Sequence, residues 1–298
     1  MREMRELLAG VFAPITTPFR GDKVDEKGLV HNIEKMNATG LRGYFVLGTN
    51  GEYKSLSVPE RWDVLKTVVR RRGRDKVVMA GCGAESTHET LELVRKAVDL
   101  GADMVSLLMP SFFAKKMAVD VLERYVREVA DASPAPVLLY NNPSVAAGVT
   151  VRMELLGRLA DHERVVGIKD SSKETWRENL AARSDRFFVL AGSAAFFLEL
   201  LRGGGTGGVL SLANAFPEEC VRLFLAQREG RAEDADRLNT RLVELNTQVS
   251  GTYGVAGVKA AMDMAGYAGG EPRRPHLGLK PEEVAQLRVV LQTNGFLR

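Results

Sequence analysis

The chain has 298 residues, a hydrophobic content of 45%, a charged content of 27% and a formal net charge of +3. This length allows two average domains or one large α/β barrel, and the small net charge argues against nucleic acid as a partner. No apolar stretch approaches the roughly 20 residues that a membrane helix needs, and the charged start Met1–Glu6 leads into no signal-peptide core. We therefore expect no membrane partner.

Cysteine and histidine usage narrows the class further. Cys82 and Cys220 are two isolated thiols in a large chain, which is typical of a reducing cytoplasm. The four histidines are scattered, at positions 31, 88, 162 and 276, and no His-x-His or His-to-carboxylate spacing typical of a metal site occurs. The sequence therefore predicts a cytoplasmic protein whose chemistry uses no metal.

Short apolar runs alternate with amphipathic stretches along the chain. Eight runs predict strands, at residues 11–17, 43–48, 77–82, 104–109, 137–141, 165–169, 187–192 and 208–212. Helix start signals lie between them, as in the capping-box patterns Ser57-Val58-Pro59-Glu60 and Ser86-Thr87-His88-Glu89. Eight such units predict an α/β fold, a (β/α)8 TIM barrel over residues 1–229. Helical patterns at 231–250, 255–266 and 281–293 predict a C-terminal helical extension over residues 230–298.

An open doubly wound sheet is the competing architecture. That fold carries a glycine fingerprint after its first strand, but here the first strand is followed by Thr16-Thr17-Pro18-Phe19. The glycine-rich run 203–208 precedes a strand, so we interpret it as a turn at the amino-terminal face of the barrel.

Lys169 closes the apolar run 165–169 and is the leading candidate for a functional residue. A lysine is rarely buried without a reason. At the carboxyl end of a core strand, desolvation lowers the pKa of the amine, and a neutral amine is a nucleophile toward a carbonyl carbon. A surface lysine that reaches back to water just past a strand end is the alternative.

The carboxyl ends of other strands supply fitting partners, and this is the end where barrels build active sites. The second strand leads into Gly48-Thr49-Asn50-Gly51-Glu52, a loop whose backbone N–H groups suit a carboxylate. Tyr140 lies near the end of the fifth strand, at the level of Lys169, and suits proton transfer. The seventh strand ends at Gly192-Ser193, where glycine lets a ligand approach the backbone. Together these residues predict a Schiff-base site for a 2-oxo acid.

Three motifs carry a resemblance to a known family: Gly48-Thr49-Asn50-Gly51-Glu52, Tyr140-Asn141-Asn142-Pro143 and Gly167-Ile168-Lys169-Asp170. In order and spacing the chain resembles the dihydrodipicolinate synthase / N-acetylneuraminate lyase family of class I pyruvate-dependent aldolases, over essentially its whole length. The resemblance implies that Lys169 forms an imine with pyruvate, that Tyr140 relays protons, and that Thr49 and the Asn50 amide orient Tyr140 and hold the carboxylate. It also implies that Gly192 and Leu210 line the pyruvate pocket, that no metal or organic cofactor is needed, and that the enzyme is a homotetramer built as a dimer of dimers.

Departures from the family pattern concern the second substrate. Dihydrodipicolinate synthases carry an arginine where this chain has Val145, and the nearest arginine downstream is Arg152. They also use a tyrosine from a neighbouring subunit where this chain has Phe112-Phe113. The relay is therefore expected to end on Ser111 or on water.

Other positions favour one branch of the family. Asn50, Ser171 and the stretch 255–275 resemble 4-hydroxy-2-oxoglutarate aldolases and related 3-deoxy-hexulosonate aldolases. This favours cleavage of a 4-hydroxy-2-oxo acid to pyruvate and an aldehyde, with Asn50, Ser171 and Asn142 as neutral donors to the distal group. The alternatives are a 4-hydroxy-tetrahydrodipicolinate synthase, which condenses pyruvate with aspartate semialdehyde, and a non-catalytic pyruvate-binding sensor.

Overall fold

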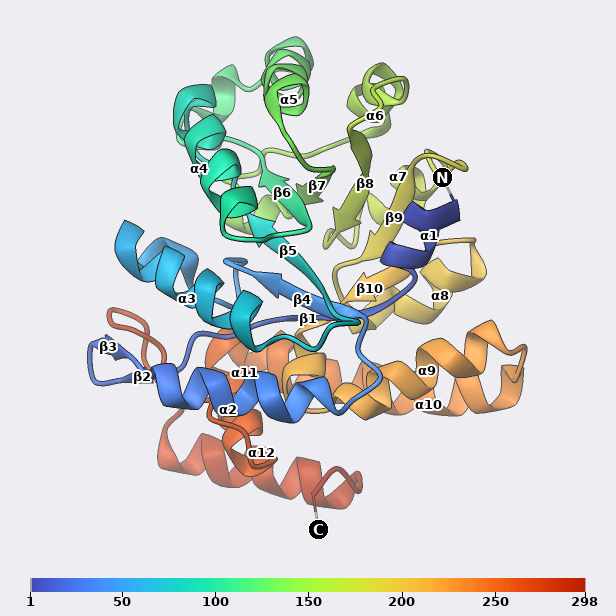
Figure 1. Ribbon diagram of the computed structural model, residues 1–298. Coiled ribbons are helices and arrows are strands. Elements are labelled where there is room, and N and C mark those ends of the chain that lie inside the picture. Colours follow the sequence, from blue (N-terminus) through green and yellow to red (C-terminus); the bar gives the residue numbers. More distant parts are fainter. Residues whose placement is uncertain (1, 298) are drawn as a thin grey trace.

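The computed structural model describes residues 2–297 and shows a closed barrel of parallel strands surrounded by helices (Figure 1). Around the barrel the strand order is β1-β10-β9-β8-β7-β6-β5-β4. The strands are β1 (Gly10–Pro14), β4 (Gly43–Val46), β5 (Val77–Gly81), β6 (Met104–Leu108), β7 (Val137–Asn141), β8 (Val165–Asp170), β9 (Phe188–Ala191) and β10 (Gly207–Val209). The predicted (β/α)8 barrel is confirmed. A two-stranded hairpin of β2 (Phe19–Arg20) and β3 (Lys23–Val24) was not predicted.

Helices cover the outside of the barrel, and their start signals act as the sequence indicates. They are α2 (Glu26–Asn37), α3 (Val58–Arg71), α4 (Thr87–Asp99), α5 (Val119–Ala132), α6 (Met153–Leu159), α7 (Trp176–Leu180), α8 (Phe197–Arg202) and α9 (Pro217–Arg228). Before α3, the Ser57 amide donates to the Glu60 carboxylate at 2.8 Å. Before α4, the Ser86 hydroxyl accepts from the Glu89 amide at 3.1 Å. These contacts satisfy backbone donors that a helix start leaves free.

The barrel interior is apolar at its amino-terminal end. Inward side chains of the strands form one buried cluster, which includes Phe12, Phe45, Met104, Leu138 and Phe188. Helix α1 (Arg2–Leu8) closes this end, because Leu8 joins the same cluster and is fully buried. Polar chemistry is therefore left to the opposite end, where the strands terminate.

The C-terminal segment packs against α9 and returns to the barrel (Figure 1). It comprises α10 (Ala232–Asn246), the π-helical segment η6 (Thr247–Gly251), α11 (Thr252–Met264) and α12 (Pro281–Thr293). The helical pattern predicted at 231–250 is α-helical up to Asn246, and the backbone then widens into π geometry. Inside α11, Gly254 has φ 57°, which breaks the helix where glycine allows it. Within residues 2–297, no helix is long and apolar enough to cross a membrane.

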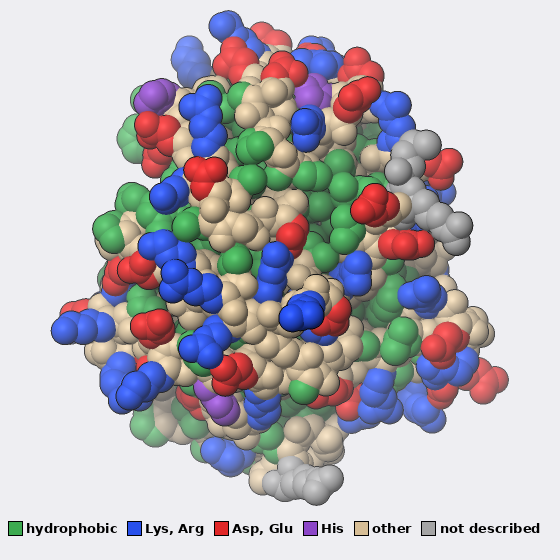
Figure 2. Space-filling model, in the orientation of Figure 1, with side chains coloured by type: hydrophobic (Ala, Val, Ile, Leu, Met, Phe, Trp, Pro, Cys, Tyr) green, Lys and Arg blue, Asp and Glu red, His purple; other side chains and the backbone are tan. Residues whose placement is uncertain are grey.

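The surface carries both charge signs. On the face drawn in Figure 2, Lys and Arg side chains are interspersed with Asp and Glu side chains. This distribution fits the small net charge and gives this face no extended field of one sign.

Candidate active site

An irregularity in β8 turns Lys169 into the barrel. The register against β7 pairs Val137 with Val165 but Leu138 with Gly167, so Val166 is an extra residue on β8. Val166 packs in the cluster inside the barrel, whereas Ile168 packs outward in the cluster between the strands and the helices. The bulge therefore lets residue 169 face inward as well. Gly167 permits this, because a Cβ there would lie 2.0 Å from the Phe188 carbonyl oxygen on β9.

Lys169 is consequently a buried amine set against aromatic rings. It is 4% exposed, and its Nζ lies 3.9 Å from the ring centroid of Tyr140 and 4.5 Å from that of Phe45. Burial lowers the pKa of Lys169, and attraction to Tyr140 opposes that shift only in part. A larger share of the amine is therefore neutral and nucleophilic near neutral pH than for a lysine in water.

Tyr140, on the neighbouring strand, presents its hydroxyl to three polar groups. The Thr49 hydroxyl shares a hydrogen bond with it at 3.2 Å, and Asn142 Nδ2 donates to it at 3.0 Å. Burial raises the pKa of Tyr140, but the positive charge of Lys169 and hydrogen bonds from Thr49, Asn142 and Lys169 outweigh burial and leave the pKa below its usual value. The phenol is thus suited to exchange a proton with a bound substrate.

The residue after Lys169 anchors this end of β8. The carboxylate of Asp170 is fully buried and accepts from Asn141 Nδ2 at 2.9 Å, Asn179 Nδ2 at 2.7 Å and the Thr175 hydroxyl at 3.0 Å. These donors tie the ends of β7 and β8 to α7 and its N-cap. The positions of Tyr140 and Lys169 relative to each other are therefore rigidly set.

The other predicted binding residues lie at the same end of the barrel, in varied settings. Asn50 Nδ2 donates to the Ser211 hydroxyl at 2.8 Å, so this side chain already has a protein partner. The Ser171 hydroxyl lies 3.5 Å from the Gly192 carbonyl oxygen. Ser193 accepts from the Ala195 amide at 3.2 Å and so caps a short helical turn. Leu210 is fully buried after β10.

In the loop after β6, the polar groups contact Glu85 and not the Lys169–Tyr140 pair. Both the Ser111 amide and the Phe112 amide donate to Glu85 at 2.8 Å, and the Ser111 hydroxyl lies 3.4 Å from the same carboxylate. The rings of Phe112 and Phe113 are 78% and 67% exposed and meet edge to face. The structure thus places Ser111 beside Glu85, and no contact joins it to Tyr140 among the described residues.

The two positions that bear on the second substrate are also at the surface. Val145 is 42% exposed in a short helical turn, η3 (Pro143–Val145). Arg152 precedes α6 and pairs with Glu178 at 3.7 Å.

Sequence reasoning missed Ser106 and Tyr53. Both line a cavity of about 10 Å³ beside Tyr140, roughly the space of one water molecule. The Ser106 hydroxyl is buried and has no hydrogen-bond partner among the described residues. Its inward position follows from β6, where Met104 and Leu108 face the same way, so alternation along the strand was the signal that could have found it.

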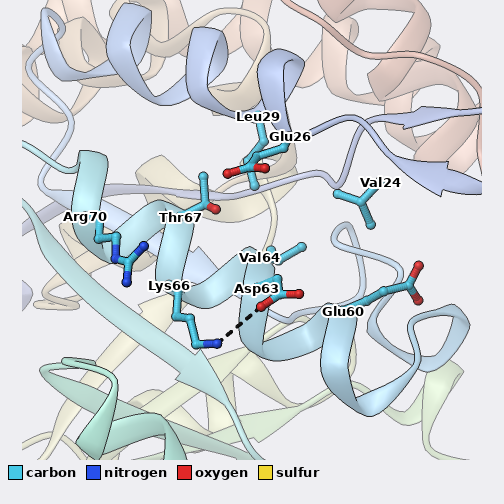
Figure 3. A pocket seen from close by; sticks show the side chains of 9 residues that line it. All are labelled: Val24, Glu26, Leu29, Glu60, Asp63, Val64, Lys66, Thr67 and Arg70. Atoms are coloured by element: carbon cyan, nitrogen blue, oxygen red, sulfur yellow. Dashed lines mark hydrogen bonds and ion pairs between the residues drawn. The ribbon is translucent and has the colours of Figure 1, made fainter.

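A separate hollow of about 310 Å³ lies outside the barrel between α2 and α3 (Figure 3). Lys66 pairs with Asp63 across 3.2 Å there, and Glu60 and Arg70 lie at opposite ends. It contains none of the residues around Lys169, and the carboxylate of Glu60 pairs with Arg273, which lies outside the lining. Within residues 2–297, no cluster of three or more His, Cys, Asp and Glu side chains has the form of a metal site.

A buried lysine and tyrosine at the carboxyl ends of adjacent barrel strands agree with the comparison to known families. The model of the dihydrodipicolinate synthetase family matches residues 7–294. The chain belongs to this family. It is therefore an enzyme of the carbon–carbon lyase class.

Individual members of the family resemble the chain to a similar degree. It is 33% identical over 293 residues to the probable mitochondrial 4-hydroxy-2-oxoglutarate aldolase of Emericella nidulans, covering 95% of this chain and 94% of that protein. It is 32% identical over 294 residues to the 4-hydroxy-tetrahydrodipicolinate synthase of Thermodesulfovibrio yellowstonii, covering 98% of this chain and all of that protein (100%).

Solved structures of the family superpose closely. The dihydrodipicolinate synthase of Thermotoga maritima gives a TM-score of 0.90 at 28% identity, covering 97% of this chain and 99% of that chain. A prophage protein of the same family from E. coli K12, solved in complex with pyruvate, gives 0.89 at 28% identity, covering 96% and 98%. The likeness extends over the whole barrel, and both activities occur among the relatives.

Proposed function

We propose that this enzyme cleaves a 4-hydroxy-2-oxo acid to pyruvate and an aldehyde through an imine on Lys169. The observation that carries the proposal is the buried Lys169 amine set against Tyr140, whose hydroxyl is held by Thr49 and Asn142. For 4-hydroxy-2-oxoglutarate the aldehyde is glyoxylate, and for a 2-keto-3-deoxy sugar acid it is a sugar-derived aldehyde.

The neutral amine of Lys169 attacks the 2-oxo carbon, and loss of water gives a protonated imine. Tyr140 takes the proton of the C4 hydroxyl as the C3–C4 bond breaks, and the bonding electrons move into the iminium to form an enamine. Tyr140 then returns the proton to C3, and hydrolysis of the imine releases pyruvate and restores the amine. Thr49 and the backbone amide of Asn50 hold the substrate carboxylate throughout.

The residues around the distal part of the substrate support cleavage over synthase activity. Val145 offers no charge to a second carboxylate, and Arg152 is engaged with Glu178. A synthase that binds aspartate semialdehyde gains from a bidentate guanidinium contact. Neutral donors such as Ser171 and Asn142 suit a hydroxyl or a single carboxylate.

We also propose a cytoplasmic homotetramer. The exposed, edge-to-face pair Phe112–Phe113 supports a subunit contact, because large apolar side chains gathered on a surface mark interaction sites. The free, buried thiols of Cys82 and Cys220 suit a reducing compartment. Sedimentation equilibrium of the purified protein measures the assembly directly.

A substrate panel tests the proposed reaction. Pyruvate release is measured with 4-hydroxy-2-oxoglutarate and with 2-keto-3-deoxy sugar acids, and condensation is measured with pyruvate and aspartate semialdehyde. We expect the highest kcat/KM for cleavage of a 4-hydroxy-2-oxo acid, and no turnover of any substrate by Lys169→Met. The best turnover with aspartate semialdehyde would instead identify a synthase.

A further inference from the structure

The loop that carries Thr49 and Asn50 is held in an unusual backbone conformation. Leu47 and Glu52, at its two ends, have φ of 59° and 52°, the left-handed region that side chains rarely adopt. Such conformations persist where the surrounding structure fixes them. The place of Thr49 and Asn50 therefore depends on what holds the ends of this loop.

A buried lysine on α11 holds the Glu52 end. The Lys259 side chain is fully buried, and its Nζ lies 2.6 Å from Glu52 Oε1 and donates to the Glu271 carbonyl at 3.0 Å. The other carboxylate oxygen of Glu52 accepts from the Arg273 backbone amide at 2.9 Å. Buried charges of opposite sign require each other, because neither is solvated by water. The C-terminal segment therefore holds Glu52 from two directions.

The guanidinium of Arg273 links the C-terminal segment to residues that follow the loop. It donates to the Ser55 carbonyl at 2.8 Å and to the Glu60 carboxylate at 2.7 and 2.8 Å. Lys259 and Arg273 both lie over the Phe19 ring, 4.5 and 4.6 Å from its centroid. Glu60 is the acid at one end of the outer hollow in Figure 3, so the attachment reaches from the barrel end to α3.

We infer that Lys259, acting through Glu52, is a positioning residue for the loop that binds the substrate carboxylate. The inference rests on the proposed function, since it assigns the loop the task of holding pyruvate. Lys259 does not contact the reacting atoms. It fixes where the Thr49 hydroxyl and the Asn50 amide stand, and a displacement of these groups weakens pyruvate binding before it affects the amine of Lys169.

The test compares two buried lysines. Lys76 is 6% exposed and donates to the carbonyls of Thr39 and Leu41 at 2.9 and 2.8 Å, just before β5 at the opposite end of the barrel. For Lys259→Met and Lys76→Met, the thermal midpoint and the pyruvate concentration that half-saturates borohydride trapping are measured. We expect Lys259→Met to raise that concentration by about ten- to a hundredfold. Lys76→Met is expected to lower the thermal midpoint and leave the half-saturating concentration unchanged.

Two further variants, Glu52→Gln alone and Glu52→Gln combined with Lys259→Met, test the inference if Lys259→Met alone does not fold. Glu52→Gln keeps the shape of the side chain and its acceptor for Arg273, and Glu52→Gln with Lys259→Met removes both buried charges. We expect the double variant to recover thermal stability while its half-saturating pyruvate concentration stays high. Recovery of both together, or equal effects of Lys259→Met and Lys76→Met, would overturn the inference. Absence of any adduct in the wild type would instead overturn the proposed function.

Discussion

Removing one hydroxyl, with Tyr140→Phe, separates bond cleavage from imine formation. The phenol is the proposed base for the C4 hydroxyl, and positioned acid–base groups contribute about 10²- to 10⁴-fold to rates. We therefore expect kcat for cleavage to fall by this factor, about 3–5 kcal/mol in barrier height. The variant also removes the hydrogen bonds that the Tyr140 hydroxyl makes with Thr49 at 3.2 Å and with Asn142 at 3.0 Å. This loss lowers the free energy of unfolding by about 1–3 kcal/mol.

The pH dependence of the same variant has a defined sign. Burial lowers the pKa of Lys169, while attraction to Tyr140 raises it. With the phenol gone only burial remains, so the pKa of Lys169 falls further and the midpoint of imine formation moves to lower pH. Pyruvate with borohydride, followed by intact mass across a pH series, measures this midpoint.

The matched control is Tyr125→Phe. Tyr125 is also buried, and its hydroxyl lies 2.9 Å from that of Thr90, away from Lys169. It loses a comparable hydrogen bond, so urea denaturation should show a similar loss of stability with cleavage retained. Cleavage by Tyr140→Phe within a few-fold of wild type would refute the assignment of Tyr140 as the base.

Two further variants probe the frame of the site. Gly192→Ala places a Cβ 1.9 Å from Ser171 Oγ and 2.8 Å from the Asp170 carbonyl oxygen, so we expect weaker trapping of pyruvate by borohydride. The control is Gly157→Ala, on the open surface of a helix, which should keep trapping and stabilise the protein by about 0.5–1 kcal/mol. Hydrogen bonds from Arg273 lower the pKa of Glu60 to about 2, so its stabilising effect is present above pH 4.5 and lost as pH falls toward 2. Glu60→Gln should therefore destabilise by about 2 kcal/mol at pH 7, after allowance for solvent screening, and urea titrations should show the difference shrinking between pH 5 and pH 2.

The barrel was predictable because its strands are continuous apolar runs, and each of the eight begins within one residue of its predicted start. A parallel strand covered on both faces leaves this pattern wherever it occurs. The carboxyl ends of the strands were less predictable. The apolar residues that follow Val46 and Val209 continue the pattern in the sequence, but they leave the sheet and belong to the loops at the site. The two-residue strands β2 and β3 are too short to give any periodicity.

The chemistry at Lys169 and Tyr140 was predictable for a related reason. Both residues interrupt apolar runs, and a polar side chain at a strand end is conspicuous. Their supporting contacts were not predictable. Arg273 meets Glu52 from 221 positions away, and pairing at that separation leaves no local pattern. The bulge at Val166, which turns Lys169 inward, depends on the register against β7 and so appears only in three dimensions.

The central claim is that Lys169 carries the substrate as an imine. Incubation with pyruvate and borohydride, followed by intact mass measurement and peptide mapping, tests it most directly. The account predicts one stable adduct per chain, located on Lys169 and lost in Lys169→Met. No adduct, or an adduct on another buried lysine such as Lys259 or Lys76, would contradict it.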